Sequence, residues 1–231
     1  MGEVIFALDD ERLEAALGWV DRLKDRISWF KVGSALFTRY GPKSILAARE
    51  AGANRIFLDL KFHDIPTTVL KALQGAAELG VDMVNLHILS GQETLEMCSA
   101  WVRSLPEGSH RPLVVGVTVL SSLKTEDLQM LGFAGPRERL LFELASLGKH
   151  ACLDGVVASG EEIGPVRKAF PKDFLIVCPG VFVGDGMSLP KDQKNSLHAN
   201  EAFSLGADFV VLGRSLRQCQ DPQGILATLA R

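Results

Sequence analysis

The chain has 231 residues, an apolar fraction of 47%, a charged fraction of 23% and a net charge of −3. These values are typical of a globular protein and exclude the strongly basic surface of a nucleic-acid-binding protein. No apolar run approaches the roughly 18 residues of a membrane span, and the start, MGEVIFALDDER, lacks a signal-peptide pattern. We therefore expect a cytoplasmic protein that binds neither nucleic acid nor a membrane, with reduced cysteines.

Short β-rich runs recur along the chain, and each is followed by a segment with helical periodicity or turn residues. The predicted strands are 4–8, 29–32, 55–61, 82–88, 113–120, 154–159, 174–178 and 208–213. The predicted helical segments are 10–26, 42–52, 66–80, 91–105, 136–150, 161–170 and 196–207. This alternation predicts an α/β fold, a (β/α)8 TIM barrel formed by a single domain over residues 1–231. A doubly wound sheet is the alternative, but no G-x-G-x-x-G follows the first strand.

Charged residues are predicted to meet at the mouth of this barrel, where the carboxyl ends of the strands lie. The first three strands end in Asp9, Lys31, and Asp59 with Lys61. Because Asp59 and Lys61 are two residues apart in a strand, both should face the mouth. Alternating charges can remain ionised away from water, which favours an active site. The alternative is a structural ion pair, with Asp64 as the N-cap of the next helix.

The other side of the mouth has the features of a phosphate site. Gly213 and Arg214 follow the last strand, where backbone N–H groups and a guanidinium suit a phosphate dianion. The loop 179–194 is long and rich in glycine, so we expect a lid that closes over the phosphate. The alternative for Gly213 and Arg214 is a helix cap with a surface Arg. The alternative for the loop is a surface insertion. His87 could contact a ligand or pack structurally, and the histidines show no metal-ligand spacing.

One longer motif links these features to a known family. FLDLKFHDIPTTV, residues 57–69, resembles the D-x-K-x-x-D-I-P-x-T-V signature of the orotidine 5′-phosphate decarboxylase family. The resemblance covers essentially the whole chain, because further family motifs follow in the family's order. They are ALD at 7–9, KVG at 31–33, GVTVLSS at 116–122, PGV at 179–181, DQK at 192–194 and GRS at 213–215.

The resemblance implies cofactor-free decarboxylation of orotidine 5′-monophosphate (OMP) to uridine 5′-monophosphate (UMP) in pyrimidine biosynthesis, with Lys61 protonating the C6 carbanion. It also implies a homodimer with shared active sites, into which Asp64 and Thr68 cross from the neighbouring subunit. The implied catalytic residues are Lys61, Asp59, Lys31 and Asp64, with no metal. The implied substrate-binding residues are Asp9 and Lys31 for the ribose, Ser121 for the pyrimidine, Gln193, Gly213 and Arg214 for the phosphate, and Ile65, Thr68 and Pro179.

The chain departs from the family pattern at one position of the phosphate site. Bacterial members have an Arg where Phe182 stands, so one phosphate contact is missing unless Lys191 or Lys194 replaces it. Two other functions stay open. Relatives that act on keto-hexulose phosphates with Mg²⁺ share D-x-K-x-x-D but have an acid where this chain has Lys31. A phosphate-ligand sensor would need no chemistry, and the intact set of charged residues argues against it.

Overall fold

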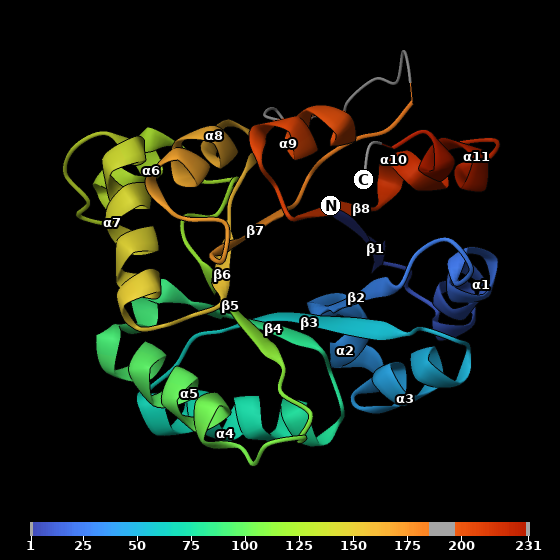
Figure 1. Ribbon diagram of the computed structural model, residues 1–231, viewed down its shortest axis with the longest axis horizontal. Coiled ribbons are helices and arrows are strands. Elements are labelled where there is room, and N and C mark those ends of the chain that lie inside the picture. The colour runs from blue at the N-terminus through green and yellow to red at the C-terminus, as the bar shows by residue number, and fades with distance from the viewer. Residues whose placement is uncertain (1, 185–196, 230–231) are drawn as a thin grey trace.

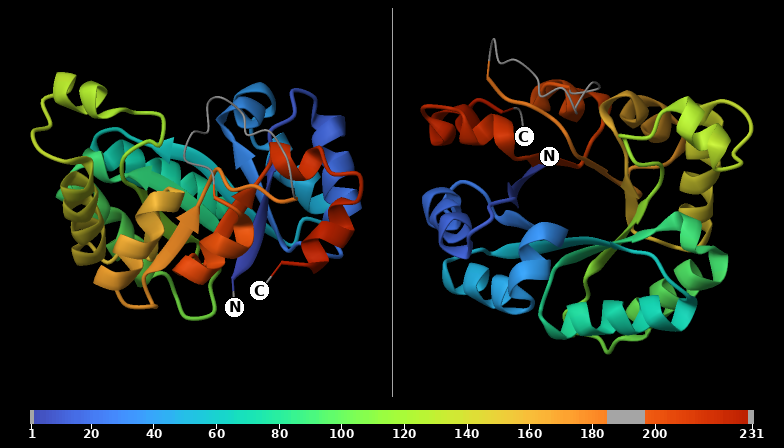
Figure 2. Two further views of the ribbon diagram at one scale, coloured as in Figure 1. Left: turned by 90° about the horizontal axis from the view of Figure 1, so that it is seen from above. Right: turned by 180° about the vertical axis from the view of Figure 1, so that it is seen from behind.

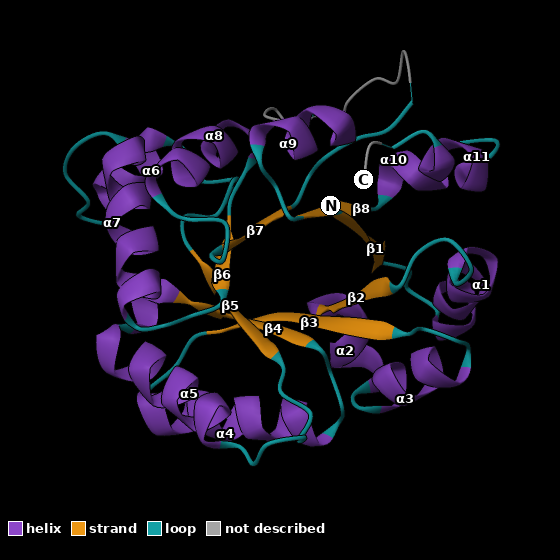
Figure 3. Ribbon diagram, in the orientation of Figure 1, coloured by secondary structure: helices purple, strands orange, loops and turns teal. Residues whose placement is uncertain are grey.

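The computed structural model describes residues 2–184 and 197–229, in which eight parallel strands close into a barrel in chain order. Figure 1 and Figure 3 show these strands inside a layer of helices, and the view from behind in Figure 2 shows helices on all sides. The strands are β1 Glu3–Leu8, β2 Trp29–Gly33, β3 Arg55–Phe62, β4 Met83–His87, β5 Leu113–Val117, β6 Gly155–Val157, β7 Leu175–Cys178 and β8 Phe209–Leu212. The predicted TIM barrel is confirmed.

The helices follow the strands, as the alternation predicts. They are α1 Leu13–Leu23, α2 Ser34–Tyr40, α3 Lys43–Glu50, α4 Pro66–Glu78, the 3₁₀ turn η1 Ile88–Ser90, α5 Gln92–Ser104, α6 Thr125–Met130, α7 Arg137–His150, α8 Gly160–Ala169, α9 Ala199–Leu205, α10 Arg214–Arg217 and α11 Pro222–Ala227. Helices α2, α6 and α11 are not among the helical segments predicted from the sequence pattern. Each is 6 or 7 residues long, too short to display a clear helical period.

Apolar side chains form two layers, one on each side of the barrel wall. The larger layer lies between strands and helices and includes Phe6, Phe30 and Ile56. The smaller layer fills the inside of the barrel and includes Trp29, Phe57 and Phe209. Successive residues of a strand point to opposite faces, so each strand contributes to both layers. In the part of the chain that the structure describes, these side chains fill the barrel interior, and a TIM barrel binds its ligands at the carboxyl ends of its strands.

Aspartates at the amino ends of three strands have a structural role. Asp82, Asp154 and Asp208 precede β4, β6 and β8, and each carboxylate accepts a backbone hydrogen bond from the preceding strand. The donors are the N–H groups of Ile56 (2.7 Å), Val114 (2.6 Å) and Ile176 (2.8 Å). These carboxylates tie neighbouring strands together at the amino end of the barrel, opposite the end where a TIM barrel carries its chemistry.

Strand β5 is shorter than predicted, and this moves one predicted site residue. The strand ends at Val117, which is the last residue paired with β4 and also the last paired with β6. Beyond Val117 no neighbouring strand of the described chain continues the ladder, so the predicted extension to residue 120 is wrong. Ser121 consequently lies in an exposed turn between β5 and α6, and not at a strand end.

Candidate active site

A cavity of about 210 Å³ lies at the carboxyl ends of the barrel strands. Its wall combines the apolar inner layer with polar groups that follow the strands. The polar side chains are Asp9, Lys31, Asp59, Lys61, Asn85, Arg214 and Ser215. Pro179, Gly180 and Gly213 also line the cavity. The structure thus brings together the charged residues of the first three strands and the candidate phosphate residues after β7 and β8.

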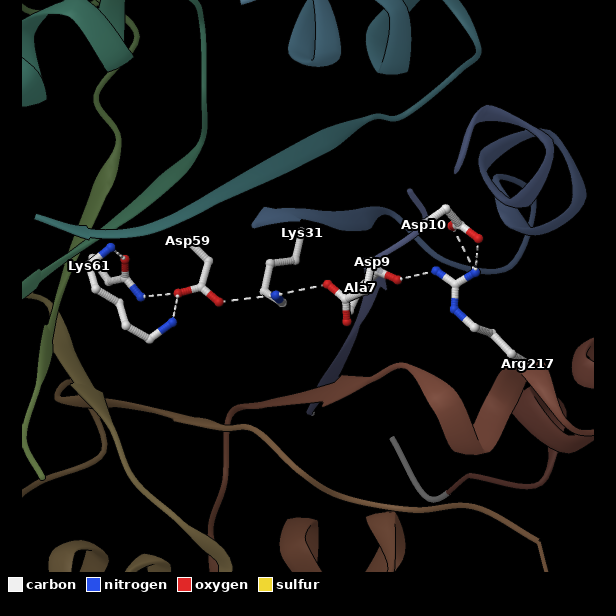
Figure 4. Close-up of polar contacts among 8 residues, drawn as sticks. Ala7, Asp9, Asp10, Lys31, Asp59, Lys61 and Arg217 are labelled. Carbon is white, nitrogen blue, oxygen red and sulfur yellow. Dashed lines mark hydrogen bonds and ion pairs between the residues drawn. The ribbon is translucent and has the colours of Figure 1, made fainter. Parts of the chain in front are cut away.

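Four charged side chains form a continuous row in this cavity, as predicted (Figure 4). The Lys31 ammonium lies 3.5 Å from Asp9 Oδ1 and 3.0 Å from Asp59 Oδ2. The other Asp59 oxygen accepts a hydrogen bond of 2.6 Å from the Lys61 ammonium. The signs alternate from Asp9 to Lys61, so every neighbouring pair attracts.

The middle of the row is buried and its ends are open. The side chains of Lys31 and Asp59 are 13% and 12% exposed, whereas those of Asp9 and Lys61 are 54% and 38% exposed. Burial would raise the pKa of Asp59, but the charges of Lys31 and Lys61 outweigh it and lower this pKa to about 2. Burial would lower the pKa of Lys31, but Asp59 and Asp9 raise it above its ordinary value. Asp59 and Lys31 are therefore both ionised at neutral pH.

A local irregularity in β3 presents Asp59 and Lys61 to the cavity. Leu58 pairs with Val84 and Phe62 with Leu86, so β3 uses two more residues than β4 over this stretch. Lys61 has a positive φ of 51°, which is uncommon for a residue other than glycine. Such strain persists where the surroundings hold it, and functional sites are where it concentrates.

Asn85 holds this irregularity, and no sequence motif had marked it as a site residue. Its side-chain oxygen accepts a hydrogen bond of 2.8 Å from the Lys61 backbone N–H, and its amide nitrogen donates one of 2.6 Å to Asp59 Oδ1. Asn85 is 1% exposed and lies in the middle of β4. One signal was available: a buried amide within the apolar run MVNLH needs partners, because an unsatisfied polar group costs free energy there.

The residues after β3 do not join the cavity of their own chain. Asp64, Ile65 and Thr68 are exposed and are absent from its described lining. The alternative that Asp64 caps the next helix is wrong, since the N-cap of α4 is Ile65. The Asp64 carboxylate instead accepts a hydrogen bond of 2.6 Å from the adjacent Ile65 N–H.

The remaining predicted substrate-binding residues have mixed outcomes. Pro179, Gly213 and Arg214 line the cavity, and Arg214 is the first residue of α10. Ser121 is not among the described residues that line it. Gln193, Lys191, Lys194 and most of the predicted lid 179–194 lie outside the described residues.

Phe182 has a structural role in place of the Arg expected from the family pattern. It exchanges backbone hydrogen bonds of 3.0 and 2.9 Å with Leu197 and Ala199. Its ring packs edge-on against His198, with centroids 5.5 Å apart. Phe182 therefore joins the two chain segments on either side of residues 185–196.

His87 packs beside the charged row and is not among the described lining residues of the cavity. Its ring centroid is 5.1 Å from that of His63, which in turn lies 2.7 Å from Ser90 through Nδ1 and Oγ. Burial, with the charges of His63 and Lys61, lowers the pKa of His87. His87 Nδ1 is buried and has no hydrogen-bond partner among the described residues, so the structural alternative leaves one ring nitrogen unsatisfied.

The described residues were also compared with the requirements of a metal site and of a membrane-spanning helix. Across residues 2–184 and 197–229, no three His, Cys, Asp or Glu side chains cluster as metal ligands would. The helices described there are too short or too polar to cross a membrane.

A family model described as the orotidine 5′-phosphate decarboxylase / HUMPS family matches residues 2–229. The chain belongs to this family. The expectation drawn from FLDLKFHDIPTTV is therefore confirmed. The family motifs ALD, KVG and GRS each contribute residues to the lining of the cavity.

Similar proteins from two bacteria carry the name orotidine 5′-phosphate decarboxylase. The protein of Syntrophus aciditrophicus is 46% identical over 227 residues, which cover 95% of this chain and 88% of the relative. The protein of Pelobacter propionicus is 42% identical over 220 residues, covering 95% of this chain and 90% of the relative. Similarity to each of these decarboxylases thus covers 95% of this chain.

Solved structures show the same barrel. Orotidine 5′-phosphate decarboxylase from Lactobacillus acidophilus has a TM-score of 0.84 and 27% identity, covering 99% of this chain and 97% of that one. A Geobacillus kaustophilus protein described as uncharacterized and conserved also has a TM-score of 0.84, with 31% identity, covering 98% and 97%. The agreement covers nearly the whole length of all three chains.

Proposed function

We propose that this protein decarboxylates OMP to UMP and CO₂, a step of pyrimidine biosynthesis, and acts in the cytoplasm. The observation that carries the proposal is the row Asp9–Lys31–Asp59–Lys61 in the cavity of a chain 46% identical to a protein named orotidine 5′-phosphate decarboxylase. The family description also covers HUMPS proteins. Lys31, at the position where the keto-hexulose phosphate relatives have an acid, favours the decarboxylase of OMP.

Lys61 is the proposed proton donor. When the bond between C6 and the carboxylate breaks, CO₂ leaves and the electron pair stays on C6 of the pyrimidine. The Lys61 ammonium, which lines the cavity, gives its proton to C6 and is reprotonated from solvent. A fixed positive charge beside C6 stabilises the carbanion as it develops, so the field favours the transition state. The proposed reaction needs no metal or cofactor, because the lysine supplies both the charge and the proton.

Asp59 and Lys31 keep that ammonium in place. Asp59 holds Lys61 at 2.6 Å, and Lys31 at 3.0 Å balances the Asp59 charge. Preorganised charges of this kind need no reorientation when the reaction occurs. Asp9 and Lys31 lie at the end of the row nearer the candidate phosphate residues, where the proposed ligand groups are the ribose hydroxyls.

Binding of the remaining substrate groups is proposed from the family pattern. Gly213 and Arg214, with Pro179 nearby and Gln193, take the phosphate. Ser121, on the exposed turn after β5 and outside the described cavity lining, is the family pattern's partner for the pyrimidine amide. Remote phosphate contacts supply binding energy that positions the reacting carbon at Lys61.

We also propose a homodimer in which each subunit completes the other's site. Asp64 and Ile65 lie between β3 and α4, and Thr68 lies in the first turn of α4, yet all three are absent from the described lining of their own chain's cavity. Ile65 is 64% exposed, and a second copy of the chain would bury this aliphatic side chain. Asp64 and Thr68 would then reach the neighbouring cavity.

A direct turnover assay tests the function. The loss of OMP is followed by absorbance, with and without EDTA, for the unmodified protein and for Lys61→Ala. We expect EDTA-resistant turnover that falls by a factor of about 10² to 10⁴ in Lys61→Ala, the usual contribution of a positioned proton donor. Activity abolished by EDTA and restored by Mg²⁺ would favour the sugar-phosphate relatives. Tight UMP binding without turnover would favour a sensor.

A further inference from the structure

Arg217 forms an unusually complete set of contacts for a residue outside the cavity. It is the last residue of α10, and its side chain is 17% exposed. Nη1 lies 2.8 Å from both Asp10 carboxylate oxygens, and Nη2 donates a hydrogen bond of 2.7 Å to the Ala7 carbonyl. The guanidinium also lies over the rings of Phe6 and Trp19, at 4.9 and 5.2 Å from their centroids. One cation is thus held by an anion, a carbonyl and two aromatic faces.

These contacts bracket Asp9, the first member of the charged row (Figure 4). Ala7 and Asp10 lie on either side of Asp9 in the chain, and Arg217 binds both. The β1–β2 ladder continues to Leu8, but the β1–β8 ladder ends at Phe6. Beyond Phe6, Arg217 therefore supplies a connection between β1 and the chain that follows β8.

The same turn carries the candidate phosphate residues. Gly213 and Arg214 line the cavity immediately before Arg217 in the chain. A Cβ on Gly213 would lie 3.5 Å from Asp9 Oδ2 and 3.6 Å from Ala7 Cβ, so this glycine packs directly against the end of β1. The position of α10 relative to β1 consequently determines how far the phosphate residues lie from Asp9 and Lys31.

We propose that Arg217 is a positioning residue that holds α10 against the end of β1. It thereby sets the distance from the phosphate residues Gly213 and Arg214 to the row Asp9–Lys31–Asp59–Lys61. The inference rests on the proposed function. Its consequence is that Arg217 matters for a substrate held at both ends of the site, and much less for one that lacks the phosphate. A purely structural role would affect the two substrates alike.

The test compares kcat/KM for OMP and for orotidine, the same substrate without its phosphate, in Arg217→Met and Asp10→Asn. We expect each variant to lose a factor of about 10 to 100 on OMP, as a small misplacement of a bound substrate does, and less than about threefold on orotidine. Arg217→Lys, which keeps the charge beside Asp10, should recover part of the loss. Asp10→Asn removes the ion pair but leaves the Arg217 guanidinium on its aromatic rings. This variant therefore tests the positioning role if Arg217→Met does not fold.

Arg22→Met is the matched control. The exposed Arg22, on α1, also holds its guanidinium over Trp19, at 5.2 Å, but among the described residues it has no hydrogen bond or ion pair to Ala7 or Asp10, so both activities should be unchanged. Equal losses on the two substrates, or full activity of folded Arg217→Met on OMP, would overturn the inference while the proposed function stands. An unmodified protein that turns over neither substrate would overturn both.

Discussion

The backbone N–H of Lys61 donates a hydrogen bond of 2.8 Å to the side-chain oxygen of Asn85 on the neighbouring strand. The side-chain nitrogen of Asn85 donates a hydrogen bond of 2.6 Å to Asp59 Oδ1. A single buried side chain therefore satisfies a backbone group that the irregular ladder leaves out and orients the carboxylate that holds the Lys61 ammonium. The site depends on this contact between β3 and β4 as much as on the charges themselves.

Replacement of Asn85 should reduce both stability and activity. Asn85→Ala leaves the partly buried Lys61 N–H without its acceptor, which costs about 1 to 3 kcal/mol in the free energy of unfolding. Because the Lys61 backbone then lacks the hydrogen bond that fixes its position, kcat should fall by a factor of about 10 to 100. Ser99→Ala removes another buried polar group, on α5, and should affect stability alone. Urea unfolding and OMP turnover measure the two effects, and full activity of Asn85→Ala would contradict the positioning role.

Mixing two inactive variants tests the shared sites. Lys61→Ala and Asp64→Ala should each be inactive, and their mixture should recover about a quarter of the unmodified activity, because half of the randomly exchanged dimers are mixed and each has one intact site. Subunit exchange is confirmed separately, with differently tagged chains. A mixture that exchanges subunits but stays inactive would rule out a site completed by Asp64 of the neighbour.

The buried carboxylate of Asp59 should make stability depend on acid pH. Its pKa is lowered from 3.8 to about 2, so the unfolded chain takes up the proton before the folded chain does. The contribution is present above pH 3.8 and is lost as pH falls towards 2; it amounts to about 2 kcal/mol.

Chemical denaturation between about pH 5 and pH 2.5 measures this loss. Asp59→Asn should flatten the decrease in unfolding free energy over that interval by about 2 kcal/mol. Asp173→Asn, which removes a carboxylate with a 74% exposed side chain, should leave the decrease unchanged. Identical profiles for Asp59→Asn and the unmodified protein would mean that Asp59 is not held ionised by its lysines.

A glycine in the barrel wall should tolerate no side chain. A Cβ on Gly155 of β6 would collide with the Leu175 carbonyl of β7, so Gly155→Ala should destabilise the protein by about 1 to 3 kcal/mol. Gly18, on the exposed face of α1, has no atom within 4 Å of the place a Cβ would occupy, and Gly18→Ala should stabilise by about 0.5 to 1 kcal/mol. Thermal unfolding compares the two, and equal midpoints would contradict the packing argument.

The amino-acid sequence by itself determined the barrel and the composition of its mouth. Apolar runs alternate with helical segments, and charged residues stand at the ends of the first three strands, so the meeting of Lys31, Asp59 and Lys61 at the mouth could be predicted from their places in the chain. The family signature lies in the same segment, residues 57–69. These features need no knowledge of which distant residue touches which.

Tertiary structure alone decided the remainder. The two extra residues in β3 and the end of β5 at Val117 depend on where neighbouring strands stop pairing. Asn85 acquires its role only when β4 lies beside that irregularity. Arg217 reaches Asp10 from a position 207 residues away in the chain, a contact that exists because the barrel closes β8 onto β1. Periodicity describes each element separately, whereas register and closure are set by competition among all the strands for hydrogen-bond partners.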